Sequence, residues 1–204
     1  MELPREFFGR DPLTCSRELI GCELFAGECS GIIVETEAYS AVGDEACHTF
    51  FRPSTRRFME CHDAGAAYVY LNYGMYWLFN VLIKGRGGAQ DGFVLIRAVE
   101  PVRGIELMRQ RRGRHALREL CSGPGKLSQA FGICGADHGI DLCGEKIGFR
   151  RALEKPQVET CVRIGISKAA HLPWRYLLKG SLFVSVAAGG KKPRGKRSYT
   201  DSKK

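Results

Sequence analysis

The sequence predicts a single domain of the α+β class, followed by a short basic tail. Its 204 residues are 44% hydrophobic and 26% charged, which is the composition of a globular protein. Helical patterns alternate with short strands that pair as hairpins, and there is no internal repeat or clear linker. We therefore expect one mixed domain over residues 1–187, with residues 188–204 forming a disordered tail.

Several classes of protein are excluded by simple patterns. No run approaches the roughly 18 apolar residues of a membrane span, and the N-terminus lacks the pattern of a signal peptide. The nine cysteines are odd in number and include no C-x-x-C, which favours reduced thiols and an intracellular protein. Cys47-His48 and Cys61-His62 are adjacent pairs, which is poor spacing for zinc, so no metal is predicted.

The net charge of +9 indicates a polyanionic partner, most commonly nucleic acid. The tail carries seven Lys or Arg and one Asp and so supplies +6 of this charge, which leaves +3 for the domain. A solubilising tail is the alternative explanation. It does not account for a second basic cluster near residue 110, made of Arg109, Arg111, Arg112 and Arg114.

The first elements read as a helix and a hairpin. Asp11 caps a helix that begins at Pro12 and ends at Gly21. Two strands follow, Cys22–Ala26 and Gly31–Tyr39. Alternation along the second strand places two carboxylates and a phenol on one face, those of Glu35, Glu37 and Tyr39. Such a face is either solvated or the wall of a site, and spacing alone does not choose between the carboxylates.

The segment from Ser40 to Ala66 is expected to be mostly irregular, punctuated by Gly43, Pro53 and Gly65. A loop of this length is often functional. It contains His48, although a lone histidine is more often structural than catalytic. Arginines 52, 56 and 57 make the loop basic.

A second hairpin is predicted from Tyr68–Tyr73 and Tyr76–Ile83, with Gly74 in the turn and Tyr73 at or near the tip. An aromatic residue at an exposed tip has nothing to bury it. Either another part of the chain covers Tyr73, or it is a wedge that inserts into something apolar such as stacked bases.

The strand Phe93–Val99 is nearly all apolar and is expected at the centre of the sheet. Arg97 lies within it and needs a carboxylate or phosphate nearby, since burial of an unpaired charge is costly. We expect a helix from Pro101 to Arg112, and further strands at Val162–Ile166, after Trp174 and at Leu182–Val186.

Residues 122–127 read S-G-P-G-K-L, which lacks the spacing of a Walker A motif. They lead into a helix expected from Lys126 to Phe131. Its first N–H groups and Lys126 could hold a backbone phosphate. A plain tight turn explains the glycines equally well.

Six motifs in order resemble the alkyladenine (3-methyladenine) DNA glycosylase family. They are I-V-E-T-E-A-Y, His48 nine residues later, Y-V-Y-x-x-Y-G-M-Y with Asn80, V-L-I-R-A-V-E-P, S-G-P-G-K-L, and R-I-G-I with P-W-R-Y…G-S. The resemblance runs from about Phe7 to Val186. The loop after His48 departs from it, since F-F-R-P-S-T-R-R-F-M-E replaces a motif that ends in Arg-Asn before Met-Phe. In the family this loop forms the rim of the pocket that binds the damaged base, so the resemblance does not predict the residues of that rim.

The resemblance implies a curved, mainly antiparallel sheet with flanking helices and a protruding hairpin, and a site without metal or cofactor. It implies that Glu37 activates water, which Arg97 and the main-chain carbonyl of Ile164 help to hold. Tyr39, His48 and Tyr70 would surround an extruded base, and Asn80 would exclude undamaged guanine. Tyr73 would take the place of the base in the duplex. The DNA contacts expected beside it are those of Met75, Tyr76, Lys126 and Arg57.

The function so implied is that of a monomeric DNA glycosylase that binds damaged duplex DNA from the minor groove. It would rotate alkylated or deaminated purines (3-methyladenine, 7-methylguanine, hypoxanthine, ethenoadenine) out of the helix. It would then hydrolyse the N-glycosidic bond without lyase activity. Its location would be intracellular: the cytoplasm or nucleoid in a bacterium, or the nucleus in a eukaryote. The alternative is a non-catalytic binder of damaged nucleic acid with the same fold, which would not need Glu37 together with Arg97.

Overall fold

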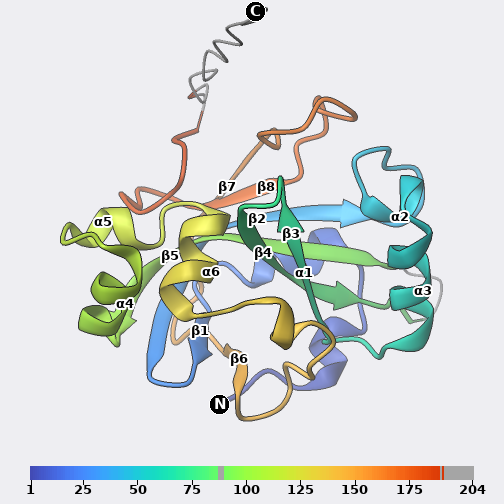
Figure 1. The fold of residues 1–204 in the computed structure, drawn as a ribbon. Coiled ribbons are helices and arrows are strands. Elements are labelled where there is room, and N and C mark those ends of the chain that lie inside the picture. The colour runs from blue at the N-terminus through green and yellow to red at the C-terminus, as the bar shows by residue number, and fades with distance from the viewer. Residues whose placement is uncertain (87–89, 189, 191–204) are drawn as a thin grey trace, which may run out of the picture.

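A computed structural model describes residues 1–86, 90–188 and 190 of the chain (Figure 1). Eight strands form one sheet in which every pair is antiparallel, in the order β3-β4-β5-β2-β1-β6. Beyond the end of β1, β8 pairs with β2, and β7 pairs with β8. The strands are β1 Glu23–Ala26, β2 Cys29–Ser40, β3 Ala67–Asn72, β4 Tyr76–Ile83, β5 Gly92–Arg103, β6 Ile147–Arg150, β7 Val158–Cys161 and β8 Arg175–Leu178. The predicted curved, antiparallel sheet is confirmed.

Short helices flank the sheet at both ends (Figure 1). The α-helices are α1 Pro12–Glu18, α2 His48–Phe51, α3 Pro53–Cys61, α4 Ile105–Arg112, α5 Leu117–Leu120 and α6 Pro124–Phe131, and the 3-10 helices are η1 Arg5–Phe8 and η2 Gly135–Asp137. The helix α1 begins as predicted, because the Asp11 carboxylate accepts a hydrogen bond of 2.9 Å from the Thr14 N–H. None of the described helices is long and apolar enough to cross a membrane.

The strand β2 lies at the centre of the fold and is buried on both faces. On one face the Thr36 hydroxyl bonds to Ser16 of α1 within the main core. On the other face lie the carboxylates of Glu35 and Glu37. The register of β2 against β5 shifts on either side of Glu35, so the strand bulges there. Bulges re-aim side chains, and this one lies at the position of the charged face.

The prediction of an irregular segment from Ser40 to Ala66 was wrong in its second half, which forms α2 and α3. Pro53 was taken as a breaker, but it occupies the first position of α3, where its missing N–H costs nothing. The buried Thr55, Phe58 and Met59 then hold α3 against the sheet.

The helix predicted from Pro101 begins instead at Ile105, because β5 continues to Arg103. Pro101 pairs with Gly31 where the register shifts, a place where a residue without an N–H is tolerated in a sheet. Gly104, with φ +70°, then turns the chain into α4. The helix α6 begins at Pro124, two residues before the predicted Lys126.

Two of the strands predicted in the C-terminal part of the chain were also wrong. Residues 162–166 and 182–186 form no strand, while β7 ends just before the first of these segments and β8 precedes the second. Instead of pairing with a strand, both segments donate hydrogen bonds to buried carboxylates, which are described below.

All nine cysteines lie in the described part of the chain and are free thiols, as the sequence indicated. Five of them are buried, and burial raises the pKa of Cys15 and of Cys121 to about 12. The basic tail predicted to be disordered lies, from residue 191 on, outside the described residues.

Candidate active site

A network of four buried charges lies where β2 meets β5 and β8. Arg97 of β5 bridges the two carboxylates, with its Nε 2.8 Å from Glu35 Oε1 and its Nη1 3.1 Å from Glu37 Oε2. Arg175 of β8 lies 3.0 Å from the same Glu35 oxygen. All four side chains are almost completely buried. Because two carboxylates face two guanidiniums, the network is balanced in charge, which is what burial requires.

Glu35 is occupied on both oxygens by groups of the protein. Besides the two arginines, Ser185 donates from its N–H at 2.6 Å and from its hydroxyl at 2.9 Å. Burial alone would raise the pKa of Glu35, but Arg97 and Ser185 outweigh it and hold this pKa below its usual 4.5. Glu35 is therefore a structural anion, and the segment around Ser185 is bound to it. Sequence reasoning assigned no role to Ser185 or Arg175, because both lie about 150 positions away along the chain.

Glu37 has a different set of partners. The Tyr39 hydroxyl donates to Oε2 at 2.7 Å and the main-chain N–H of Ile164 donates to Oε1 at 2.9 Å. Its side chain has no exposed surface. Ile164 thus contacts Glu37 through its N–H. The predicted role of the Ile164 carbonyl in holding water stays a prediction. Three donors from three strands or loops fix the carboxylate of Glu37 beside Tyr39.

A second buried ion pair holds the Ile164 backbone in place. The guanidinium of Arg163 binds both oxygens of Asp44, at 2.6 and 2.8 Å, and donates to the main-chain oxygen of Ala38 at 3.0 Å. It also lies 4.6 Å from the centroid of the Tyr39 ring. Neither Arg163 nor Asp44 was singled out from the sequence. An arginine that follows a strand is usually exposed, so a buried partner could not be inferred.

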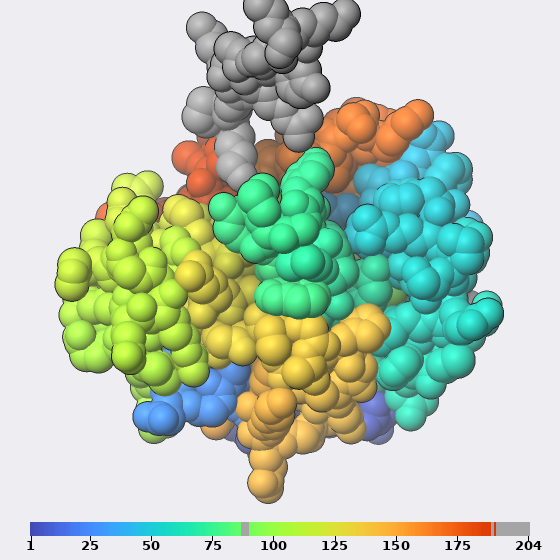
Figure 2. All heavy atoms as spheres, viewed as in Figure 1, coloured from blue at the N-terminus to red at the C-terminus, as the bar shows by residue number. Residues whose placement is uncertain are grey.

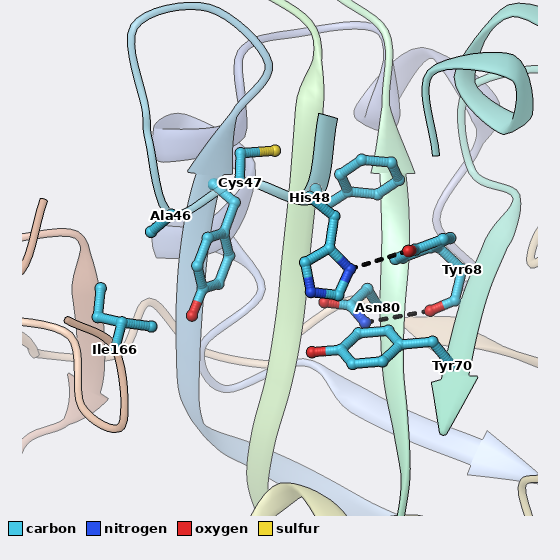
Figure 3. A pocket seen from close by; sticks show the side chains of 9 residues that line it. Ala46, Cys47, His48, Tyr68, Tyr70, Asn80 and Ile166 are labelled. Carbon is cyan, nitrogen blue, oxygen red and sulfur yellow. Dashed lines mark hydrogen bonds between the residues drawn. The ribbon is translucent and has the colours of Figure 1, made fainter. Parts of the chain in front are cut away.

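A pocket of about 80 Å³ opens next to Tyr39, with several times the space that one water molecule needs. It is lined by Tyr39, Ala46, Cys47, His48, Tyr68, Tyr70, Asn80, Phe93 and Ile166. All four residues predicted to surround a base are among them. His48, Tyr70 and Asn80 lie on one side of the cavity and Ile166 on the other (Figure 3).

Polar contacts fix the walls of this pocket. His48 Nδ1 lies 2.9 Å from the Tyr68 hydroxyl, and its ring packs 4.4 Å from that of Tyr70. The Asn80 amide donates to the main-chain oxygen of Tyr68 at 3.1 Å. Burial first, and then the charge of Arg52, lower the pKa of His48 to about 4. His48 is therefore a neutral wall at pH 7, and the pocket is flat-sided and aromatic.

The β3–β4 hairpin protrudes beside this pocket, between α6 and the α2–α3 segment (Figures 1 and 2). Its tip is apolar yet exposed: 77% of Tyr73, 66% of Met75 and 51% of Tyr76 are open to solvent. Tyr73 has a φ of +50°, a left-handed conformation that bulky residues rarely adopt. Strain of this kind collects at functional sites. The alternative explanation required another part of the chain to cover Tyr73. No described part of the chain covers the tip.

The S-G-P-G-K-L stretch lies directly against the hairpin. A side chain at Gly125 would meet the Tyr76 side chain at 2.9 Å, so the glycine allows α6 and β4 to approach closely. Lys126 is thereby placed near the tip and donates to the Ser122 hydroxyl at 3.3 Å. Arg57 is exposed on α3. The predicted contacts of Lys126 and Arg57 with DNA stay predictions.

Fold and site together define the class of protein. A slot with flat aromatic walls suits a planar ring, and a hydrolase can use a shielded carboxylate such as that of Glu37, which lies behind the pocket wall and is bonded to the Tyr39 hydroxyl. Residues 6–182 match the family model described as Methylpurine-DNA glycosylase (MPG), so the chain belongs to that family.

Bacterial relatives match over nearly the whole length of both chains. A protein of Rhodopseudomonas palustris strain HaA2 is 45% identical over 184 residues, which is 90% of each chain. One from Nitrobacter winogradskyi is 46% identical over 183 residues, 90% of this chain and 86% of its own. One from Rubrobacter xylanophilus is 41% identical over 174 residues, 80% of this chain and 86% of its own. Each is named "Putative 3-methyladenine DNA glycosylase".

Membership of this family makes the chain an enzyme of base-excision repair that hydrolyses N-glycosyl bonds in DNA. Its substrate is DNA with damaged purines. The predicted class of enzyme is thus confirmed.

Proposed function

We propose that the chain is a monofunctional DNA glycosylase that removes 3-methyladenine, 7-methylguanine, hypoxanthine and ethenoadenine from duplex DNA. The observation that carries the proposal is the junction of Glu37 and the aromatic pocket at Tyr39. One carboxylate is fixed by three donors, and one of these donors, the Tyr39 hydroxyl, belongs to a wall of the flat-sided slot. The names of the relatives support the first of the four bases.

In this proposal the damaged base rotates out of the helix and enters between Tyr39 on one side and His48 and Tyr70 on the other. Stacking on an aromatic ring contributes about 1–3 kcal/mol per base. Asn80 is held by its bond to the Tyr68 carbonyl and would clash with the exocyclic amine of an undamaged guanine. The pocket thus selects bases by shape as well as by stacking.

Glu37 would take a proton from the attacking water and provide negative charge beside the oxocarbenium-like sugar. Arg97 and the main-chain carbonyl of Ile164 would help to hold this water. A single carboxylate suffices for a cationic methylated purine, which leaves as a neutral base, unlike in the sugar hydrolases that use two. A neutral base such as hypoxanthine must in addition take up a proton on its purine ring as the bond breaks. A lyase step requires an amine nucleophile, and the resemblance to the glycosylase family assigns that role to neither Lys84 nor Lys126. Hydrolysis is therefore the only step that we propose.

The exposed tip would enter the duplex from the minor groove, with Tyr73 filling the space that the base leaves. Met75 and Tyr76 extend the apolar tip, and apolar wedges of this kind unstack base steps. Lys126 and Arg57 would contact the backbone on either side. We propose a monomer, a catalytic domain that spans residues 1–187, and a location with the DNA inside the cell.

The competing function is a binder of damaged DNA without turnover. Such a protein has no use for a buried carboxylate beside its pocket, and keeping one there costs desolvation energy. The presence of Glu37 with its three donors therefore favours the enzyme.

The test is single-turnover release of hypoxanthine or ethenoadenine from duplex oligonucleotides, with alkylated DNA alongside, by the wild type and by Glu37→Gln. We expect release by the wild type and a loss of at least about 10³-fold in the variant, equivalent to roughly 4 kcal/mol, with lesion binding retained. If Glu37→Gln were as active as the wild type, another group would have to activate the water. Tight binding with no release by the wild type would show a binder instead.

A further inference from the structure

Arg52 lies at the rim of the pocket, in the loop between α2 and α3 where the sequence departs from the family pattern. Its guanidinium carbon is 5.7 Å from the centroid of the Tyr70 ring and 5.7 Å from that of Phe51. Arg52 does not line the pocket, whereas Tyr70 does. The cation is thus close enough for a cation–π contact with one pocket wall, and it reaches that wall from outside the cavity.

The charge of Arg52 differs from those of the other arginines near the site. Arg97 is balanced by Glu35 and Glu37, and Arg163 is balanced by Asp44 although it too lies over a pocket tyrosine. Among the ion pairs of the described residues, none joins Arg52 to a carboxylate. Its charge therefore acts on Tyr70 without cancellation by a neighbouring anion.

A ring that already attracts one cation is a poorer partner for a second. The attraction arises from the negative face of the aromatic quadrupole, and like charges repel across the ring. N3- and N7-methylated purines are cations, whereas hypoxanthine and ethenoadenine are neutral. Exclusion of water by bound DNA would strengthen the effect, because exposed Arg52 would then be less screened. The charge of Arg52 also acts on His48, another wall of the pocket. After burial, it is the second cause of the lowered pKa of His48.

We propose that Arg52 is a specificity-determining residue, which biases the pocket toward neutral lesion bases and against cationic ones. The proposal rests on the proposed function, since it concerns the choice among its substrates. Phe51, 54% exposed and packed edge-on against His48, would shield the guanidinium from one side. The departure of this loop from the family pattern would then change which bases are removed, and leave the hydrolysis itself intact.

The experiment compares release of 7-methylguanine and of hypoxanthine from otherwise identical duplexes under single-turnover conditions, with spontaneous depurination subtracted. The variants are Arg52→Gln, which removes the charge, and Arg52→Lys, which keeps it. The control Arg151→Gln removes one positive charge at an exposed position beside the N-terminus. The readout is the ratio of the two rates, which a general loss of stability or of DNA affinity does not change.

We expect Arg52→Gln to raise the ratio of 7-methylguanine to hypoxanthine release by about threefold to tenfold, the range of a single cation–π contact. Arg52→Lys and Arg151→Gln should stay within about twofold of the wild type. An unchanged ratio in Arg52→Gln, with both rates reduced equally, would show that Arg52 binds a phosphate and would overturn the proposal. An equal shift in Arg52→Lys or Arg151→Gln would also overturn it.

A second measurement compares the equilibrium affinities for the 7-methylguanine and hypoxanthine duplexes in the Glu37→Gln background. The binding ratio is the ratio of these two affinities. If the wild type released neither base, the proposed function would fail, yet the binding ratio would still decide whether Arg52 discriminates by charge. A threefold or larger shift on removal of Arg52 supports the inference, and an unchanged binding ratio refutes it.

Discussion

The buried charge network and the hairpin tip are built in opposite ways, although they lie on either side of one pocket. In the network every charge of Glu35, Glu37, Arg97 and Arg175 is matched and removed from water. At the tip, Tyr73 and Met75 are apolar and open to solvent, and Tyr73 holds a strained backbone conformation. The charges of the first region are paired within the protein, whereas the apolar side chains of the second are left open by the described residues and, in our proposal, are buried by DNA.

This difference separates residues that maintain the fold from residues that we propose to act on DNA. Changes in the network should lower stability, and changes at the tip should lower activity, with only a small change in stability where the positive φ of Tyr73 is involved. Glu37 lies between the two regions, since it belongs to the network by its contacts with Arg97 and to the pocket through Tyr39. The predictions below test this division, beginning with the largest effect.

Replacing Arg97 with Met should produce the largest loss of stability. Among the described residues, Glu37 would be left without a charged partner, and Glu35 would keep Arg175 alone. Breaking a buried ion pair from one side costs about 3–5 kcal/mol. Urea unfolding should show this loss, whereas the exposed control Arg151→Met should stay within about 0.5 kcal/mol of the wild type. Equal losses in the two variants would mean that the network does not maintain the fold.

The two carboxylates should separate in a pair of matched variants. Glu35→Gln leaves Ser185 and two arginines without their anion and should lower the free energy of unfolding by about 2–3 kcal/mol. Glu37→Gln, which leaves Arg97 paired with Glu35, should lower it by about 1 kcal/mol. Thermal and urea unfolding measure both. A larger loss for Glu37→Gln would reverse the roles assigned to the two residues.

At the tip, Tyr73→Ala and Tyr73→Gly should both reduce base release at least about tenfold, the equivalent of roughly 1.4 kcal/mol. Their stabilities should differ, because φ at this position is positive. The glycine variant should be the more stable of the two by about 1 kcal/mol. Full excision activity in both variants would show that no wedge is needed.

The last prediction concerns the pH dependence of stability contributed by His48. Its pKa of about 4 in the folded protein lies below the 6.5 of an unperturbed histidine. The unfolded state therefore binds more protons between these values, and the stability contributed by neutral His48 is complete above pH 6.5 and lost as pH falls toward 4. The difference in unfolding free energy between wild type and His48→Gln should rise across this window. A difference that is constant from pH 4 to 7 would contradict the assignment.

Much of the site could be predicted because it depends on local alternation. The shared face of Glu35, Glu37 and Tyr39 follows from the period of a strand, and Arg97 from the cost of burying a lone charge. The choice between the carboxylates could not be made this way. It depends on Ser185 and Ile164, which arrive from distant segments.

The errors in the fold have the same origin. Pro53 and Pro101 were read by their usual preferences, yet one begins a helix and the other lies at a shift of sheet register. Strand-like residues near Arg163 and Ser185 form no strand, because binding a buried carboxylate outweighs their local preference. Tertiary contacts decide such cases, and a single sequence does not contain them.

The buried cysteines bear on how such an enzyme withstands the agents that create its substrates. Alkylating agents that modify purines also attack sulfur, and the reactive form of cysteine is the thiolate. Burial raises the pKa of Cys15, Cys47 and Cys121, so each is almost wholly a protonated thiol at pH 7 and is also shielded from the reagent. Cys61 is exposed, and Cys134, Cys143 and Cys161 are half-buried. The thiols of the core are therefore protected from the chemistry that damages DNA, and alkylation of the protein should begin at these four positions.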